Sequence, residues 1–172
     1  LAELVELANF PIVSSNALPE PASPLYRVRD QVLPYVIREV EGERVGIIGI
    51  LKVEKTKNSS LVSEDVAFTP EIETAARMVA ELEAQGVDKI VLLSHVGYFN
   101  DLTIARAVRG IDVIVGGDSH SLLGDAGALG EVGLAPIVSN QTGPFAGGSH
   151  AGLQTLDLGE YPTVVRGQTG DP

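Results

Sequence analysis

The sequence predicts an α/β fold built on a parallel sheet, and two apolar runs carry most of that prediction. Residues 91–93 and 111–115 are rich in valine, isoleucine and leucine, and each run ends at small residues. Short runs of this kind, bounded by Gly or Ser, are typical of buried strands. Helix signals lie between the two runs, and a helical crossover makes neighbouring strands parallel.

The first third of the chain predicts one helix and a β-hairpin. Residues 1–8 carry apolar side chains at helical spacing, and residues 12–15 predict a strand. Residues 35–40 and 44–51 flank a Glu-Gly-Glu turn, which predicts a hairpin. Because the second arm is nearly all apolar, we expect it inside a covered sheet.

The middle of the chain predicts a loop, a helix and a strand. Residues 52–60 are polar and predict a loop. Thr69 is the expected N-cap of a helix that has proline and an acid in its first turn and ends near Gly86. Its expected inner face consists of Ile72, Ala75, Ala76, Val79 and Leu82. A strand over residues 89–93 follows at once.

A shorter helix and further strands complete the predicted elements. Asn100 or Asp101 caps the helix, which runs to Arg109 and precedes the strand 111–115. Residues 121–152 are rich in glycine and predict a long functional loop with one possible strand at 136–139. Two more short strands are predicted over residues 153–158 and 163–165.

Composition excludes several classes of function. The net charge is −11, so the chain has no basic footprint for a nucleic-acid polymer and no polybasic patch for a membrane surface. No apolar run has the length of a membrane span. The chain contains no cysteine, which excludes disulfides, zinc–thiolate sites and cysteine nucleophiles.

Metal-capable side chains follow both apolar runs. His95 comes directly after the first run, and Asp118 and His120 come after the second in a Gly-Gly-Asp-Ser-His turn. Ligands of open α/β sheets bind beyond the carboxyl ends of the strands. Imidazole and carboxylate together suit zinc, manganese or iron. The sequence therefore predicts a metal site, or half of one, at this edge of the sheet.

Each candidate also has an ordinary structural interpretation. His95 could cap or fill the core at a strand end, and Asp118 could bond its own backbone in a turn. Asn140 and Gln141 offer amide donors to a substrate, and His150 could reach the site from a glycine-rich segment, although a plain surface position is the simpler interpretation. The sequence assigns no catalytic residue.

Two of these stretches also resemble a known family. Residues 93–97 (Leu-Ser-His-Val-Gly), followed by residues 110–120, resemble the late motifs of the 5′-nucleotidase branch of the calcineurin-like metallophosphoesterases. Residues 8–16 are similar to the family segment that follows its Gly-Asn-His-Glu motif, and residues 160–165 are similar to a stretch near the end of its catalytic domain. The resemblance covers most of the chain.

The resemblance implies a four-layer αββα sandwich with two divalent metal ions, which would be manganese, zinc or iron. By this correspondence His95 matches a ligand of the second metal. Asp118 stands where most members have the first histidine of Gly-His-x-His, also a ligand of the second metal. His120 matches the second histidine, a ligand of the first metal. Aspartate at position 118 would make the site harder and more anionic.

The resemblance also sets expectations for the parent protein. The early motifs Asp-x-His, Gly-Asp and Gly-Asn-His-Glu are absent from residues 1–172, as is a C-terminal substrate domain. We therefore expect the C-terminal portion of a catalytic domain, whose partner is the missing N-terminal half and which is inactive by itself. The expected parent hydrolyses small phosphate esters, foremost nucleotides, in the periplasm or outside the cell.

Two kinds of alternative stay open from the sequence. Within the enzyme class, the parent could be a phosphatase of other substrates or a sulfur-ester hydrolase. In a different class, the chain could be a metal-independent binding or structural domain that keeps the fold without catalysis.

Overall fold

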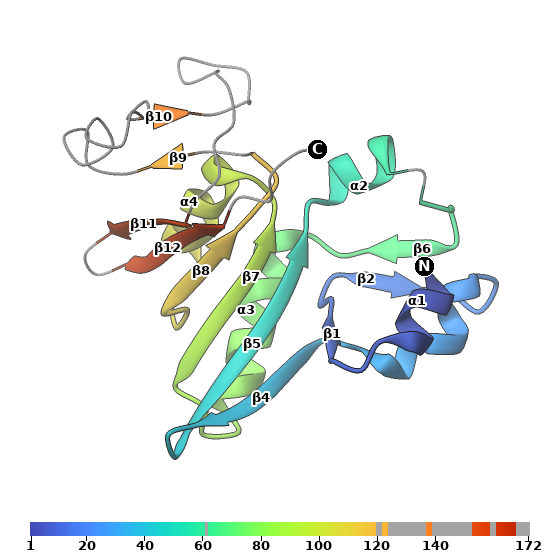
Figure 1. Cartoon of the computed structure of the whole chain (residues 1–172), viewed down its shortest axis with the longest axis horizontal. Helices are drawn as coiled ribbons and strands as arrows, with labels where there is room; N and C mark the ends of the chain where they lie inside the picture. The colour runs from blue at the N-terminus through green and yellow to red at the C-terminus, as the bar shows by residue number, and fades with distance from the viewer. Residues whose placement is uncertain (61, 120–121, 124–136, 139–152, 159–160, 168–172) are drawn as a thin grey trace.

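A six-stranded mixed sheet forms the centre of the computed structural model (Figure 1). The structure describes residues 1–60, 62–119, 122–123, 137–138, 153–158 and 161–167, and after residue 119 it describes the backbone alone. The strands lie in the order β11 (Leu153–Leu158), β12 (Tyr161–Gly167), β8 (Val113–Gly116), β7 (Lys89–His95), β5 (Glu43–Leu51) and β4 (Tyr35–Val40). The four inner strands are parallel, and both edge strands are antiparallel to their neighbours.

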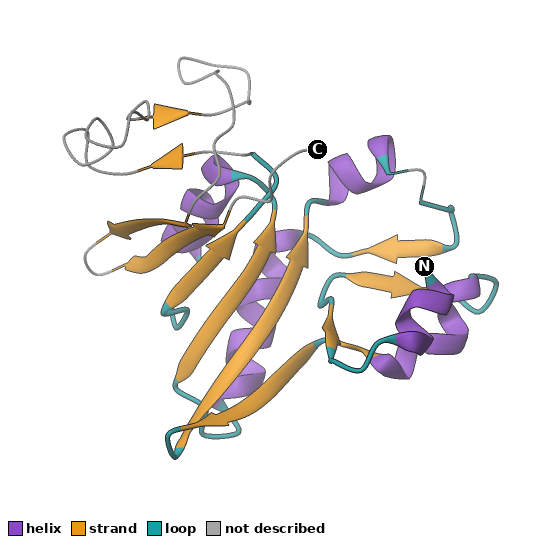
Figure 2. Ribbon diagram, in the orientation of Figure 1, coloured by secondary structure: helices purple, strands orange, loops and turns teal. Residues whose placement is uncertain are grey.

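Two helices cover one face of this sheet (Figure 2). They are α3 (Glu71–Glu83) and α4 (Tyr98–Ala107), and each one precedes or follows β7 in the chain. The main core contains Ile48, Leu92 and Ile114 from the strands together with Met78 and Leu82 from α3. Burial alternates along β7, as the two-residue period of a strand requires. The predicted α/β class and the parallel pairing of β7 with β8 are confirmed.

The N-terminal elements lie beside β4 and β5 (Figure 1). They are α1 (Ala2–Leu7), β1 (Ile12–Val13), β2 (Ala17–Pro19), the 3₁₀ helix η1 (Pro24–Gln31), β3 (Val32–Leu33) and β6 (Val66–Phe68). Val5 and Val28 form a small separate core between α1 and η1. The Ser15 amide donates to the carbonyl of Gly49 at 2.7 Å, which fastens this part to β5.

The predicted hairpin of β4 and β5 is confirmed. Its connection is a two-residue turn in which Glu41 and Gly42 both have positive φ, 53° and 85°. This is the turn geometry whose twist matches that of the flanking strands.

The predicted loop over residues 52–60 is wrong, because most of it forms the helix α2 (Val53–Ser59). Polar and charged residues follow Val53 throughout this helix, and none of its side chains is buried. A helix without an apolar face produces no 3.6-residue pattern, so periodicity did not reveal it.

Both predicted helix caps are also wrong. Pro70, rather than Thr69, occupies the N-cap of α3, and Gly97, rather than Asn100 or Asp101, occupies the N-cap of α4. On α3, Thr74 and Met78 are buried, whereas Ile72 and Ala76 are exposed. The buried face is therefore rotated from the predicted one.

The backbone beyond residue 119 matches the strand predictions. Strands β11 and β12 lie where short strands are expected, and β10 (Ile137–Val138) pairs antiparallel with β9 (Leu122–Leu123). None of the helices described has the length and apolar character that a membrane-spanning helix requires.

Candidate metal centre

The carboxyl edge of the two central strands brings His95 and Asp118 together. His95 is the last residue of β7, and Asp118 follows the last residue of β8 by two positions. Because β7 and β8 are parallel neighbours, their carboxyl ends meet at one edge. The distance from His95 Nε2 to Asp118 Oδ1 is 3.6 Å.

The turn after β8 is shaped for this approach. The Gly117 amide donates to the carbonyl of Ser94 at 2.8 Å, and a Cβ atom at position 117 would lie 3.0 Å from His95 Nδ1. Asp118 itself has a left-handed backbone, with φ of 78°. Aspartate tolerates this conformation better than most residues, at a cost of roughly 1–3 kcal/mol. Such local strain is concentrated at functional sites in proteins.

Polar contacts link the carboxyl ends of β7 and β8 to helix α4. The Ser94 hydroxyl donates to the carboxylate of Asp101, a fully buried residue of α4. The Tyr98 amide donates to the Ser119 hydroxyl at 3.0 Å. These bonds fix the start of α4 against both strand ends. The sequence predicted Asp101 as a possible helix cap and did not indicate its contact with Ser94.

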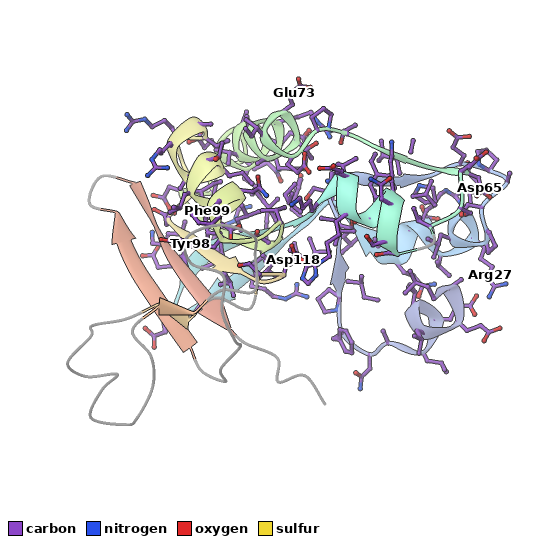
Figure 3. All side chains as sticks on the ribbon, turned by 90° about the horizontal axis from the view of Figure 1, so that it is seen from above. Arg27, Asp65, Glu73, Tyr98, Phe99 and Asp118 are labelled. Carbon is purple, nitrogen blue, oxygen red and sulfur yellow. The ribbon has the colours of Figure 1, made fainter. Side chains whose placement is uncertain are left out.

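Lys55 joins the site from helix α2. Its ammonium forms an ion pair with Asp118 Oδ1, the same oxygen that His95 approaches. The side chain of Asp118 is only 4% exposed, whereas those of Lys55 and His95 are 48% and 62% exposed. Figure 3 shows Asp118 near the middle of the molecule, between the helical layer and the N-terminal elements. No sequence signal pointed to Lys55, because its segment was predicted as a loop.

The separation of the two donor atoms fits a shared divalent ion. Nitrogen and oxygen ligands bind zinc at about 2.0–2.2 Å, so two ligands of one ion lie roughly 3.0–3.6 Å apart. The observed 3.6 Å lies at the upper end of this range. In the part of the chain that the structure describes, no group of three or more histidine, cysteine or acidic side chains surrounds such a position. His95 and Asp118 therefore form a pair of candidate metal ligands.

The other predicted site residues lie outside the described residues. These are His120, the third predicted metal ligand, and the predicted substrate contacts Asn140, Gln141 and His150.

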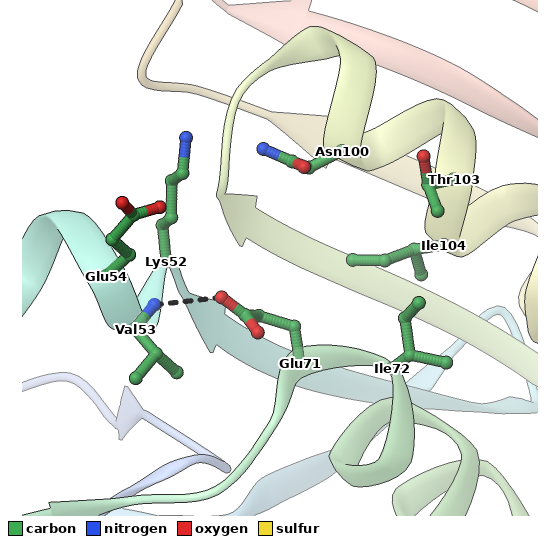
Figure 4. A pocket seen from close by; sticks show the side chains of 8 residues that line it. All are labelled: Lys52, Val53, Glu54, Glu71, Ile72, Asn100, Thr103 and Ile104. Carbon is green, nitrogen blue, oxygen red and sulfur yellow. Dashed lines mark hydrogen bonds between the residues drawn. The ribbon is translucent and has the colours of Figure 1, made fainter.

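Two hollows lie near this edge. One has a volume of about 330 Å³, and His95, Leu93, Val115 and Leu51 are among the residues that line it. The other, about 370 Å³, lies between α2, α3 and α4, where Glu71 Oε1 accepts a bond from the Val53 amide at 2.9 Å (Figure 4). Only the first hollow contains a candidate metal ligand.

Comparison with known proteins identifies the family of the chain. No family model matches the chain. However, the probable 5′-nucleotidase of Treponema pallidum is 39% identical to it over 172 residues, which is 100% of this chain. The chain belongs to the 5′-nucleotidase-like metallophosphoesterases. It spans about a quarter of the length of that relative, since the match covers 25% of it.

Solved structures confirm the fold of the chain. The NAD nucleotidase of Haemophilus influenzae superposes with a TM-score of 0.73 at 36% identity, covering 96% of this chain and 30% of its own. The 5′-nucleotidase precursor of Thermus thermophilus gives a TM-score of 0.70 at 37% identity, covering 98% of this chain and 29% of its own. The predicted fold class, part of a metallophosphoesterase αββα sandwich, is therefore confirmed.

Proposed function

We propose that this chain supplies metal ligands to a dinuclear phosphoesterase that hydrolyses nucleotides or related small phosphate esters. The observation that carries the proposal is the 3.6 Å approach of His95 Nε2 to the buried Asp118 carboxylate at the carboxyl edge of the sheet. The names of its relatives, 5′-nucleotidase and NAD nucleotidase, support the substrate class.

Each proposed ligand has a defined task. His95 and Asp118 would hold one divalent ion, and His120 would hold the other, with manganese, zinc or iron as the candidate metals. When bound, two such ions activate a water molecule and neutralise the charge that develops on the phosphoryl group. The hydrogen bond from Ser94 to Asp101 fixes the strand end that carries His95.

The substrate contacts are proposed on chemical grounds. Asn140, Gln141 and His150 offer neutral or switchable donors for a phosphate or a base. A net charge of −11 repels anionic substrates at long range, so recognition has to depend on local donors and on the metal ions.

The proposal assigns the remaining ligands and the location to the parent protein. The missing N-terminal half of the catalytic domain would bring the other metal ligands. A periplasmic or extracellular location is consistent with the word "precursor" in the name of the Thermus thermophilus relative.

Metal-dependent hydrolysis tests this function directly. The natural protein that contains this chain together with its upstream segment should release phosphate from adenosine monophosphate only when manganese or zinc is present. His95→Ala should lower kcat/KM by at least about 100-fold, because it removes a metal ligand. Lys57→Gln, on the exposed helix α2, is the matched control and should retain activity.

The alternative class predicts a different result. A metal-independent binding or structural domain would show no metal-dependent turnover in the natural protein. Full activity of the His95→Ala enzyme would refute the ligand assignment.

A further inference from the structure

We infer that Lys55 is a positioning residue that stands in for the metal cation at Asp118 and is exchanged for the ion when it binds. The inference rests on the proposed function, because it assumes that Asp118 is a metal ligand. It concerns the step before catalysis, in which the site takes up its metal.

The side chain of Asp118 is only 4% exposed, and a buried carboxylate is unfavourable unless a cation or several hydrogen-bond donors satisfy it. Lys55 provides that cation through its ion pair with Oδ1. The ion pair therefore holds the carboxylate in place until a metal ion replaces the ammonium.

The ammonium of Lys55 and the proposed metal ion would contact the same oxygen atom of Asp118. Lys55 Nζ pairs with Oδ1 of Asp118, and this oxygen is also the one 3.6 Å from His95 Nε2. A divalent ion between the imidazole and Oδ1 would lie within a few ångströms of the ammonium. Like charges at that separation repel, most strongly where water is partly excluded. The ion and the ammonium are therefore expected to compete.

Lys55 can leave its place without disturbing the core. It lies on α2, a seven-residue helix with no buried side chain, and its own side chain is about half exposed. Lysine carries its charge on a flexible four-carbon stem and is strongly hydrated in water. Moving it into solvent breaks one ion pair and no core packing.

The pairing also matches the charge of the residue at position 118. Aspartate adds one negative charge to the site, and Lys55 contributes the positive charge that balances it while the metal is absent.

The test compares Lys55→Gln with Lys57→Gln in the 172-residue chain. Without metal, Lys55→Gln should lower Tm by a few degrees, because the buried Asp118 loses its counter-charge. In calorimetric titration with manganese or zinc, the same variant should bind the ion about five- to tenfold more tightly, because no ammonium has to be displaced. Lys57→Gln, from the same helix, should leave the metal affinity unchanged, because Lys57 lies over the Phe68 ring and makes no contact with Asp118 that would compete with the ion. Lys55→Arg should restore values close to those of the original chain.

A measurement on the unaltered chain keeps the test independent of folding. Labelling with an amine-reactive reagent should modify Lys55 faster when the metal is present, because the ion releases it from Asp118, and should modify Lys57 at an unchanged rate. Mass spectrometry of the labelled peptides provides the readout.

The possible failures can be separated. Metal binding by the original chain that is unchanged or weaker in Lys55→Gln would overturn this inference and leave the proposed function intact. Slower labelling of Lys55 with metal would have the same meaning, since the lysine would then act beside the ion. Absence of any metal binding in the natural protein would overturn both proposals.

Discussion

The two ends of the central strands each pair a lysine with an aspartate, and the pairs differ in burial. At the amino end of β7, the Nζ atom of Lys89 lies 3.2 Å from Oδ1 of Asp88 and 3.0 Å from Oε2 of Glu43. At the carboxyl end, Lys55 pairs with Asp118. The lysines are similarly exposed, 46% and 48%, but Asp88 is 83% exposed and Asp118 only 4%.

This difference separates an ion pair in which water already satisfies both charges from one whose carboxylate is buried. Exposed ion pairs contribute about 0–1 kcal/mol to stability. A buried carboxylate depends on its partner, and removing that partner costs far more. The same residue types therefore form a surface pair at one end of the sheet and a pair with a buried carboxylate at the other.

The largest expected effect concerns activity at the carboxyl end. The 172-residue chain alone should show no hydrolysis of adenosine monophosphate above background, since its described residues bring only a pair of donors to the edge. Two-metal hydrolysis needs ligands for both ions. The check is a phosphate-release assay with and without manganese, in which the short chain is compared with the parent protein proposed above. Robust metal-dependent turnover by the short chain would show that further ligands have been missed.

The sequence predicted the scaffold of this edge because apolar patterns specify it. Strands β7 and β8 and helix α3 each bury one face. The spacing of their apolar residues therefore predicts where each element lies in the sequence. The meeting of His95 with Asp118 follows from the parallel crossover between the two strands. Sheet topology therefore brings together two of the three residues that the family resemblance proposes as metal ligands, and their role as ligands stays a prediction.

The residues that the sequence did not reveal are those whose contacts are polar and distant. Lys55 reaches Asp118 across 63 positions from a helix without an apolar face, and no local pattern encodes such a pair. Asp101 stood at a position suitable for capping, but Gly97 occupies the cap, and the Asp101 carboxylate accepts a hydrogen bond from Ser94. Helix propensities describe the preference of a residue for local backbone positions, so they do not predict a partner that lies far away in the sequence.

The next effect is on metal affinity, and it compares Asp118→Asn with Asp88→Asn. Asp118→Asn should weaken manganese or zinc binding by at least about tenfold, because an amide is a poorer ligand than a carboxylate for these ions. The Tm should stay within about 2 °C, because the half-exposed Lys55 can turn to solvent and asparagine tolerates a left-handed backbone. Asp88→Asn should change neither value. Calorimetry and thermal melting measure the two quantities, and a large loss of Tm in Asp118→Asn would mean that the carboxylate is mainly structural.

The smallest effect belongs to Lys89 and appears in the pH dependence of stability. Hydrogen bonds from Lys89 to Glu43 first, and then to Asp88, raise the pKa of its amine above the ordinary lysine value. A raised pKa in the folded state means that the stabilisation is fully present below the ordinary pKa and is lost as pH rises through the folded value. Lys89→Gln should therefore lower the urea midpoint slightly at pH 7, and the difference from the original chain should shrink at strongly alkaline pH and in high salt. Metal affinity should stay unchanged, because Lys89 and the candidate ligands occupy opposite ends of β7. A pH-independent difference in the urea midpoint would show that the Lys89 side chain stabilises the strand through packing instead of charge.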